Sequence, residues 1–261
     1  MEIKIYQVDA FADKVFEGNP AAVCPLSEWL SDELLQNIAQ ENNLSETAFF
    51  VAEDNGYSLR WFTPGGEVDL CGHATLASAH VLFQHLGYSE EVIAFHTISG
   101  ALLVGKSGSG YSMSFPASDI KPVEAPNELH AALGVTPVET LSDFDYVVIL
   151  DNESQVASLT PDFTKLSNLG LRGVVVSAPG ENVDFVSRCF FPKFNVDEDP
   201  VTGSAHCELA PYWAKKLGRT QLVAKQLSKR TGVVQCEVVD DRVFLSGNAV
   251  DYMSGTITIN A

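Results

Sequence analysis

An internal repeat constrains the fold of this chain more than any other feature of its sequence. When Gly72 is aligned with Gly203, each glycine begins an apolar stretch that ends at a second glycine fifteen positions later. Upstream of each stretch stands the same R-x-F-x-P pattern, at RWFTP (60–64) and RCFFP (188–192). Because glycine readily ends a helix, each half is predicted to hold a strand, a loop and a helix. The sequence therefore indicates that one structural unit is duplicated.

Hydrophobic periodicity and turn residues predict the remaining elements. In the first half, Ser31 is expected to cap a helix, Gly18-Asn19-Pro20 to form a turn, and an enclosed helix to run from about 74 to 86. Strands are expected at 3–11, 46–53, 57–64, 91–98, 101–105 and 111–115. In the second half, helices are expected near 127–133 and 203–217, with a kink or local break at Pro211. Strands are expected there at 145–150, 173–178, 183–191, 221–228, 233–239, 242–247 and 256–259.

A polar stretch with three prolines, PASDIKPVEAPNEL (116–129), has the composition of a linker. It divides the chain into an N-terminal repeat domain, residues 1–116, and a C-terminal repeat domain, residues 117–261. The last strand is expected to be able to cross back to the first domain.

Composition excludes several classes of partner. The net charge is −18, from 34 acidic and 16 basic residues, and such a surface repels nucleic acid and anionic membranes. No apolar run has the length of a membrane span, and the N-terminus lacks the pattern of a secretory signal. Five scattered cysteines without a CxxC pair indicate neither a disulfide framework nor a zinc knuckle. A soluble, cytoplasmic protein is expected.

The repeated helix starts provide a way for this acidic chain to bind an anion. The N-terminus of a helix has unpaired N–H groups and a partial positive charge, and a glycine there lets a ligand approach the backbone. Gly72 and Gly203 are therefore expected to bind a carboxylate, or a developing oxyanion, of a small anionic metabolite.

These residues lie within motifs that resemble the PhzF (phenazine-biosynthesis-like) family. The resemblance implies an α+β, diaminopimelate epimerase-like fold, with two pseudo-repeated domains, each a curved, mostly antiparallel sheet or barrel around a central helix. It implies an isomerase with its active site between the domains, no metal or organic cofactor, and a homodimer. A characterised member isomerises dihydro-3-hydroxyanthranilate by moving a proton within the ring. The motifs are FEGNPAAV, SETAFF, RWFTPGGEVDLCGHATLASAHVL, DEDPVTGSAHC, LSKRTGV and RVFLSGNAV.

The resemblance also assigns candidate catalytic residues. The glutamate of S-E-T-A, the general acid/base of relatives, corresponds to Glu46. The histidine of G-H-A-T corresponds to His73, which positions substrate or relays a proton. The aspartate and serine of D-P-V-T-G-S correspond to Asp199 and Ser204. Asp199 is expected to orient His73 or the substrate, and Ser204 to donate to the substrate or to cap the helix.

Cys71 and Thr202 are the remaining candidate binding residues, beside the two glycines. A related group racemises an α-carbon with two opposed cysteines, one in each domain, and Cys71 stands where the first would be. Its counterpart in the second half is Thr202, which is no base at neutral pH, so the two-thiol racemase is disfavoured.

Two other readings of the histidines are disfavoured by spacing. Cys71 and His73 are two residues apart near a helix start, so their side chains are expected to diverge, which argues against a protease pair. His80 and His85 are five apart, off the same-face spacing of a helix, which argues against zinc. A non-catalytic paralogue that binds a metabolite or a protein remains an alternative to the isomerase.

Overall fold

The computed structural model of the chain describes residues 1–259, and its backbone divides into two compact units. The first unit comprises residues 1–114 and the C-terminal segment that begins at Ser246, and the second comprises residues 115–245. The chain enters the second unit within β8 (Gly110–Pro116) and leaves it within β17 (Arg242–Gly247). The C-terminal domain predicted from the sequence runs to residue 261, and its last two residues lie outside the described residues.

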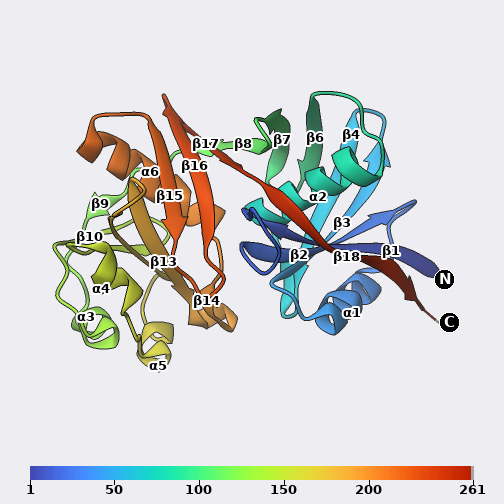
Figure 1. The fold of residues 1–261 in the computed structure, drawn as a ribbon. Coiled ribbons are helices and arrows are strands. Elements are labelled where there is room, and N and C mark those ends of the chain that lie inside the picture. The colour runs from blue at the N-terminus through green and yellow to red at the C-terminus, as the bar shows by residue number, and fades with distance from the viewer. Residues whose placement is uncertain (260–261) are drawn as a thin grey trace. The chain divides into compact units, whose positions relative to one another are not determined.

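The first unit begins with the N-terminus and closes with the strand nearest the C-terminus (Figure 1). Besides most of β8, the first unit contains β1 (Glu2–Ala10), β2 (Asn19–Leu26), α1 (Asp32–Asn42), β3 (Glu46–Glu53), β4 (Gly56–Thr63), β5 (Gly66–Val68), α2 (Gly72–His85), β6 (Val92–Thr97), β7 (Gly100–Ser107) and β18 (Ala249–Thr258).

The strands of the first unit pair in the order β18-β1-β2-β3-β4-β6-β7-β8, with β5 added to β4. Two of these pairs, β2 with β3 and β4 with β6, are parallel, and the others are antiparallel. The sheet is thus mostly antiparallel, as the family resemblance implied.

The second unit contains more short elements than the first. They are β9 (Lys121–Pro122), α3 (Asn127–Leu133), β10 (Glu139–Ser142), β11 (Tyr146–Ile149), α4 (Glu153–Ala157), α5 (Phe163–Ser167), β12 (Val174–Pro179), β13 (Phe185–Phe191), the 3₁₀ helix η1 (Pro192–Phe194), β14 (Val196–Asp199), α6 (Gly203–Leu217), β15 (Gln221–Gln226) and β16 (Gly232–Val239).

Pairing in the second unit repeats that of the first. The order is β9-β10-β11-β12-β13-β15-β16, with β14 added to β13. The parallel pairs are β11 with β12 and β13 with β15, which correspond in sequence order to β2 with β3 and β4 with β6. The duplication inferred from the two glycines is therefore confirmed by the topology.

Side chains of the R-x-F pattern confirm the same correspondence. Arg60 Nε donates to Glu67 Oε1 at 2.7 Å, and Arg188 Nε donates to Glu198 Oε1 at 2.6 Å. Each guanidinium carbon also lies 5.1 Å from the ring centroid of the phenylalanine two residues later. The repeated arginine thus ties β4 to β5 and β13 to β14, the strand that leads into each unit's central helix.

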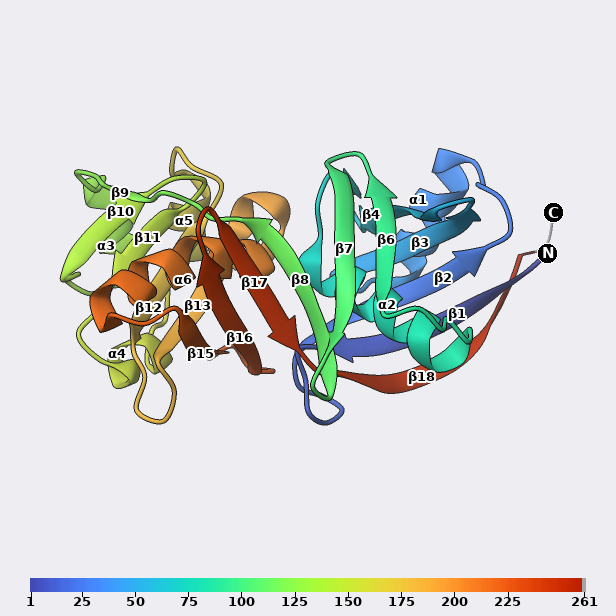
Figure 2. The same cartoon turned by 90° about the horizontal axis from the view of Figure 1, so that it is seen from above.

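Each unit has one helix against the inner face of its sheet, α2 in the first and α6 in the second (Figures 1 and 2). In α2 every residue from His73 to Leu82 is buried, and the apolar composition on all sides explains this. The observed helix begins two residues before the predicted start at Ala74. The second helix has the predicted bounds, and Gly218 ends it with φ = 67°.

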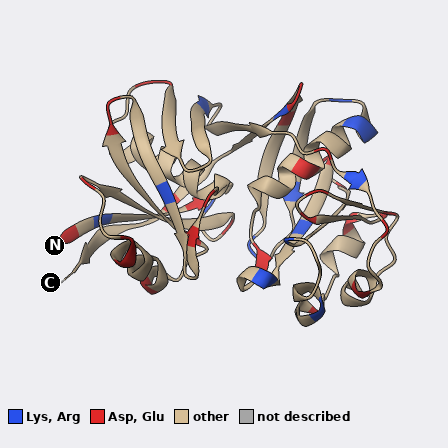
Figure 3. Cartoon of the chain, turned by 180° about the vertical axis from the view of Figure 1, so that it is seen from behind, with Lys and Arg blue, Asp and Glu red and all other residues tan. Residues whose placement is uncertain are grey.

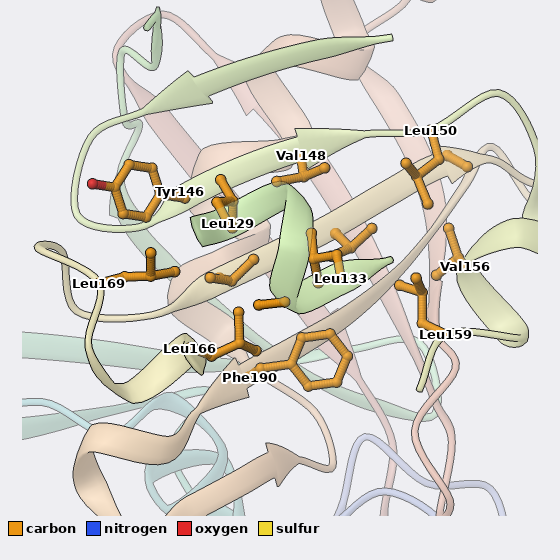
Figure 4. Packing of buried hydrophobic residues seen from close by; sticks show 14 of the residues in the cluster. Leu129, Leu133, Tyr146, Val148, Leu150, Val156, Leu159, Leu166, Leu169 and Phe190 are labelled. Atoms are coloured by element: carbon orange, nitrogen blue, oxygen red, sulfur yellow. The ribbon is translucent and has the colours of Figure 1, made fainter. Parts of the chain in front are cut away.

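The outer face of each sheet packs against other helices. In the first unit α1, capped by Ser31 as predicted, buries Leu35, Ile38 and Ala39 against Phe49 and Phe62. In the second unit α3, α4 and α5 supply leucine and valine side chains to the cluster shown in Figure 4. Because alternate residues of a strand point to opposite faces, the residues flanking Phe49 in β3 face α2 instead.

Acidic residues, red in Figure 3, lie on elements of both units. No helix among residues 1–259 is long and apolar enough to cross a membrane.

The turn predicted at Gly18-Asn19-Pro20 is only partly correct. Gly18 has φ = 65°, and a Cβ there would lie 2.1 Å from the carbonyl oxygen of Ala10. The next two residues already belong to β2, which pairs with both β1 and β3. The prolines of NPAAVCPL concealed this strand, because proline is uncommon in the interior of a sheet.

Helix α6 continues through Pro211, so the predicted local break is wrong. Proline cannot donate to the carbonyl four residues earlier, that of Cys207. This carbonyl instead accepts a hydrogen bond from the backbone N–H of Ser118 at 3.1 Å. The segment that leads out of β8 thus supplies the missing donor.

Candidate functional site

In the first unit, two neighbouring strands and the start of α2 bring four polar residues together. Glu46 is the first residue of β3 and lies on the strand face opposite Phe49, toward α2. Asn19 is the first residue of β2, and His73 is the second residue of α2. Cys71 occupies the N-cap of that helix.

The imidazole of His73 is the centre of this cluster. His73 Nε2 lies 3.0 Å from Glu46 Oε2, and neither atom has another hydrogen-bond partner within the described residues. On the other side of the ring, His73 Nδ1 lies 3.3 Å from Asn19 Nδ2 and 3.5 Å from Cys71 Sγ. The imidazole is buried, whereas 18% of the Glu46 side chain is exposed, so the carboxylate can meet a ligand.

Contact between Cys71 and His73 shows that the predicted divergence of these side chains is wrong. The prediction applied helix geometry to both residues, but Cys71 has φ = −145° and ψ = 104°, which is extended backbone. The chain turns into the helix only after Cys71, and the turn directs its thiol toward the histidine two residues later.

The environment shifts the pKa values of both side chains. Burial raises the pKa of the Cys71 thiol, and the neighbouring charge of Glu46 raises it further. Burial lowers the pKa of His73, but the negative charges that Cys71 and Glu46 can carry beside it more than offset this, so that pKa stands above its ordinary value. The thiol is therefore poorly suited to act as a nucleophile, and the imidazole is suited to pair with a carboxylate.

At the predicted anion site, Gly72 follows an N-cap residue whose side chain does not cap the helix. The Cys71 side chain makes no capping hydrogen bond, while its carbonyl accepts from both the N–H and the hydroxyl of Thr75. Cys71 occupies the position whose side chain usually caps a helix, but its thiol is directed at His73 instead.

In the second unit, the equivalent position is Thr202, the N-cap of α6. Its φ of −115° and ψ of 103° are similar to those of Cys71, and its side chain also makes no capping bond. The Thr202 hydroxyl donates to Asp199 Oδ2 instead. Sequence alignment of the two halves thus placed Cys71 and Thr202 at equivalent positions, and the structure bears this out.

The buried Gln226 of β15 braces this loop and was missed by the sequence reasoning. Its Oε1 accepts from the Thr202 N–H at 2.9 Å, and its Nε2 donates to the Asp199 carbonyl at 2.7 Å. Glutamine at the end of an alternating strand gives no signal of such a role. Asn19 was also missed as a site residue, although it stands within the quoted FEGNPAAV motif.

Arg172 was the third residue missed. Its guanidinium binds the buried carboxylate of Asp145 through Nε at 3.0 Å, and its Nη2 donates to Ser204 Oγ at 2.9 Å. Arg172 therefore orients the hydroxyl of a predicted site residue next to Gly203. The second unit thus has an arginine beside its helix start, in addition to the backbone groups at Gly203.

Glu46, Cys71 and His73 also present three atoms of the kinds that bind metal ions. Their carboxylate, thiol and imidazole atoms all lie within 4.8 Å of one another.

Comparison with known proteins identifies the family of the chain. The family profile described as phenazine biosynthesis-like protein, PhzC-PhzF, matches residues 8–255. A Pseudomonas aeruginosa relative, described as an uncharacterized isomerase, is 55% identical over 257 residues, which cover 98% of this chain and 99% of the relative. The crystal structure of a PhzF-family phenazine biosynthesis protein from Enterococcus faecalis has a TM-score of 0.97 and 49% identity, covering 99% of this chain and all of that one (100%).

A more distant structure shows how widely the fold is used. A probable proline racemase from Agrobacterium radiobacter is 10% identical, with a TM-score of 0.64, covering 99% of this chain and 93% of that chain. This likeness concerns the fold alone and confirms the epimerase-like architecture. With its profile match over nearly all its length and isomerase-named relatives, the chain belongs to the PhzC-PhzF family of phenazine biosynthesis-like proteins.

Proposed function

We propose that this protein is an isomerase that moves a proton from one carbon to another on a small metabolite bearing a carboxylate. Glu46 takes the proton as a carboxylate and returns it as a carboxylic acid, so that the bonds and charges balance over the cycle. The reaction needs no oxidant and no group transfer.

The observation that carries this proposal is the pairing of Glu46 with His73. The two atoms that face each other, Oε2 and Nε2, are buried and 3.0 Å apart, and neither has another hydrogen-bond partner among residues 1–259. Buried polar groups are ordinarily paired, so each of these two groups depends on the other. His73 thus holds the Glu46 carboxylate in place and stabilises its charge before the carboxylate takes the proton and after it has returned it.

Backbone N–H groups at Gly72 supply the second element of the proposal. A helix start whose N-cap side chain makes no capping bond suits a carboxylate or a developing enolate. In the second unit, Gly203 and the Ser204 hydroxyl offer groups of the same kind, with Arg172 holding that hydroxyl. The substrate class that follows is a small anion with an acidic C–H bond.

Proton NMR in deuterium oxide tests the proposal. Wild type, Glu46→Gln and Glu53→Gln would be incubated with dihydro-3-hydroxyanthranilate, proline, diaminopimelate and related small carboxylic acids. Glu53 is the matched control because it lies at the exposed far end of the same strand. We expect the signal of a carbon-bound proton to disappear with wild type and Glu53→Gln but to persist with Glu46→Gln.

Two results would contradict the proposal. Exchange by Glu46→Gln at the wild-type rate would remove Glu46 from the mechanism. A compound that raises the melting temperature without any proton exchange would favour the binding-only paralogue instead.

The family resemblance also supports a homodimer, which we include in the proposal. Sedimentation velocity of the full chain should give the mass of two copies, and a monomer at micromolar concentration would contradict it.

A further inference from the structure

A second cluster of titratable side chains lies in the first unit, away from Glu46 and His73. His80 and His85 lie on α2, and Asp251 lies on β18. His80 Nε2 is 3.2 Å from Asp251 Oδ1, and His85 Nε2 is 2.9 Å from the same oxygen. Three potential ligand atoms, two imidazole nitrogens and a carboxylate oxygen, thus lie within 4.8 Å of one another.

Two histidines five residues apart on α2 reach the same carboxylate oxygen, which belongs to a neighbouring strand. The argument from spacing, which separated His80 from His85, is therefore wrong. Spacing describes the direction in which each side chain leaves the helix, and a third residue placed by the fold can still lie within reach of both.

Neighbouring side chains fix the orientation of both imidazole rings. His80 Nδ1 lies 3.1 Å from the Tyr111 hydroxyl, which also accepts a hydrogen bond from Gln84 Nε2 at 3.2 Å. The ring of His85 stacks on Tyr6, with centroids 4.8 Å apart and planes 27° apart. Histidines that bind metals typically have their second nitrogen held by such a partner, and here Tyr111 leaves Nε2 of His80 directed at Asp251.

From this geometry we propose that His80, His85 and Asp251 form a binding site for a divalent transition metal ion, with Zn²⁺ the best match. Ligands at zinc's usual bond lengths and tetrahedral angles are separated by about 3.3 Å. The observed separations of 3.2 and 2.9 Å differ from this by only a few tenths of an ångström. Two imidazoles and one carboxylate are a ligand set suited to zinc, with the fourth position open to water.

Accessibility and charge both favour entry of a cation. Asp251 and His85 have 46% and 30% of their side chains exposed, whereas His80 has 9%, so the site is fixed at its base and open on one side. The net charge of −18 attracts cations to the chain as a whole.

Metal binding would join two distant parts of the chain. His85 and Asp251 are 166 positions apart, and the second unit lies between them in the sequence. A link that closes so long a loop restricts the unfolded chain strongly, so the bound ion is expected to stabilise the first unit. This role is independent of the proton-transfer reaction.

Calorimetric titration of the chelator-treated full chain with zinc chloride tests the site. Wild type is expected to bind one Zn²⁺, and His85→Asn and Asp251→Asn to bind it at least about 100-fold more weakly, since loss of a ligand exceeds loss of an outer partner. His96→Asn removes an exposed histidine elsewhere in the unit and should bind as wild type does. Cys71→Ser should also bind normally, because its cluster is separate.

Thermal unfolding with and without zinc provides a second measurement that detects misfolded variants. Zinc should raise the melting temperature of wild type, His96→Asn and Cys71→Ser, but not of His85→Asn or Asp251→Asn. Undiminished binding by folded His85→Asn and Asp251→Asn would overturn the proposal. Loss of binding in Cys71→Ser alone would overturn it too, by moving the ion to Glu46, Cys71 and His73.

Discussion

Glu46 Oε2 and His73 Nε2 lie 3.0 Å apart although their residues come from different elements, the start of β3 and the first turn of α2. Replacement of Glu46 by glutamine removes the proton acceptor but keeps the shape, and should lower turnover by about 10²–10⁴-fold. His73→Gln should cost less, because the carboxylate remains and only its orientation is lost.

The two substitutions should not be additive. Once Glu46 is an amide, His73 has no carboxylate to orient, so the double variant should be about as slow as Glu46→Gln alone. The measurement is the rate of deuterium incorporation for the four proteins under one set of conditions. Losses that multiply would show that His73 acts by a route of its own.

Cys71 should be dispensable for turnover. Burial raises the pKa of its thiol, and its counterpart at the second helix start is Thr202. Cys71→Ser is therefore expected to keep its turnover within about threefold of wild type, far from the contribution of a general base. The exchange assay used for Glu46 measures it. A loss comparable to that of Glu46→Gln would revive the two-base racemase.

Iodoacetamide provides an independent check on Cys71. All five cysteines are buried and unpaired in disulfides among the described residues, and all five have raised pKa values. The folded protein should therefore be alkylated slowly at pH 7, and the unfolded protein rapidly. Fast modification of Cys71 that a substrate suppresses would contradict this expectation.

The fold was predictable to the extent that local signals recur in the two halves. Gly72 and Gly203 begin the central helices, and R-x-F marks the strand β4 or β13 in the two units. Each pattern has the same physical role in both units, the start of a helix or the pairing of an arginine with the next strand. Apart from β2, which its prolines concealed, the missed elements, among them β5, β10, β14, α4 and α5, have five residues or fewer. Such segments are too short to show a period, and tertiary pairing defines them.

The candidate site was predictable only where a motif covers it. The contact between Cys71 and His73 depends on the extended backbone of an N-cap, and the approach of His80 to His85 depends on Asp251, which β18 brings within reach of both. Neither feature is visible in residue spacing along one helix. Arg172 lies between elements, in SNLGLRGV, and only the fold brings it to Ser204.

Glu208 should make the second unit less stable as the pH rises. It is buried on α6, with Oε1 accepting from the Asp145 N–H at 3.3 Å, and burial followed by the charge of Asp145 raises its pKa to about 8. A carboxyl whose pKa is raised on folding contributes its full stability below the unfolded value of 4.5, and loses it as the pH rises through 8.

Glu208→Gln should therefore have a higher melting temperature than wild type at pH 8.5, because the amide stays neutral. Each 1 kcal/mol corresponds to about 2–4 °C in a chain of this size, and the gain should be at least that. The advantage should shrink toward zero at pH 4.5. Glu124→Gln, which changes an exposed carboxyl of the same unit, should show no such pH dependence. An equal effect of Glu208→Gln at both pH values would contradict the assignment of the shift.

Pro211 should lower the free energy of unfolding by less than a proline inside a helix usually does. The ordinary penalty is about 3 kcal/mol relative to alanine, and part of it is the unpaired carbonyl four residues earlier. Here that carbonyl, of Cys207, is bonded to Ser118 N–H, so Pro211→Ala should raise the free energy of unfolding by less than about 1 kcal/mol. Ala214→Pro, three residues later in the same helix, is the matched control and should cost the ordinary penalty. Urea unfolding of the three proteins measures both values, and a gain near 3 kcal/mol for Pro211→Ala would show that Ser118 does not compensate.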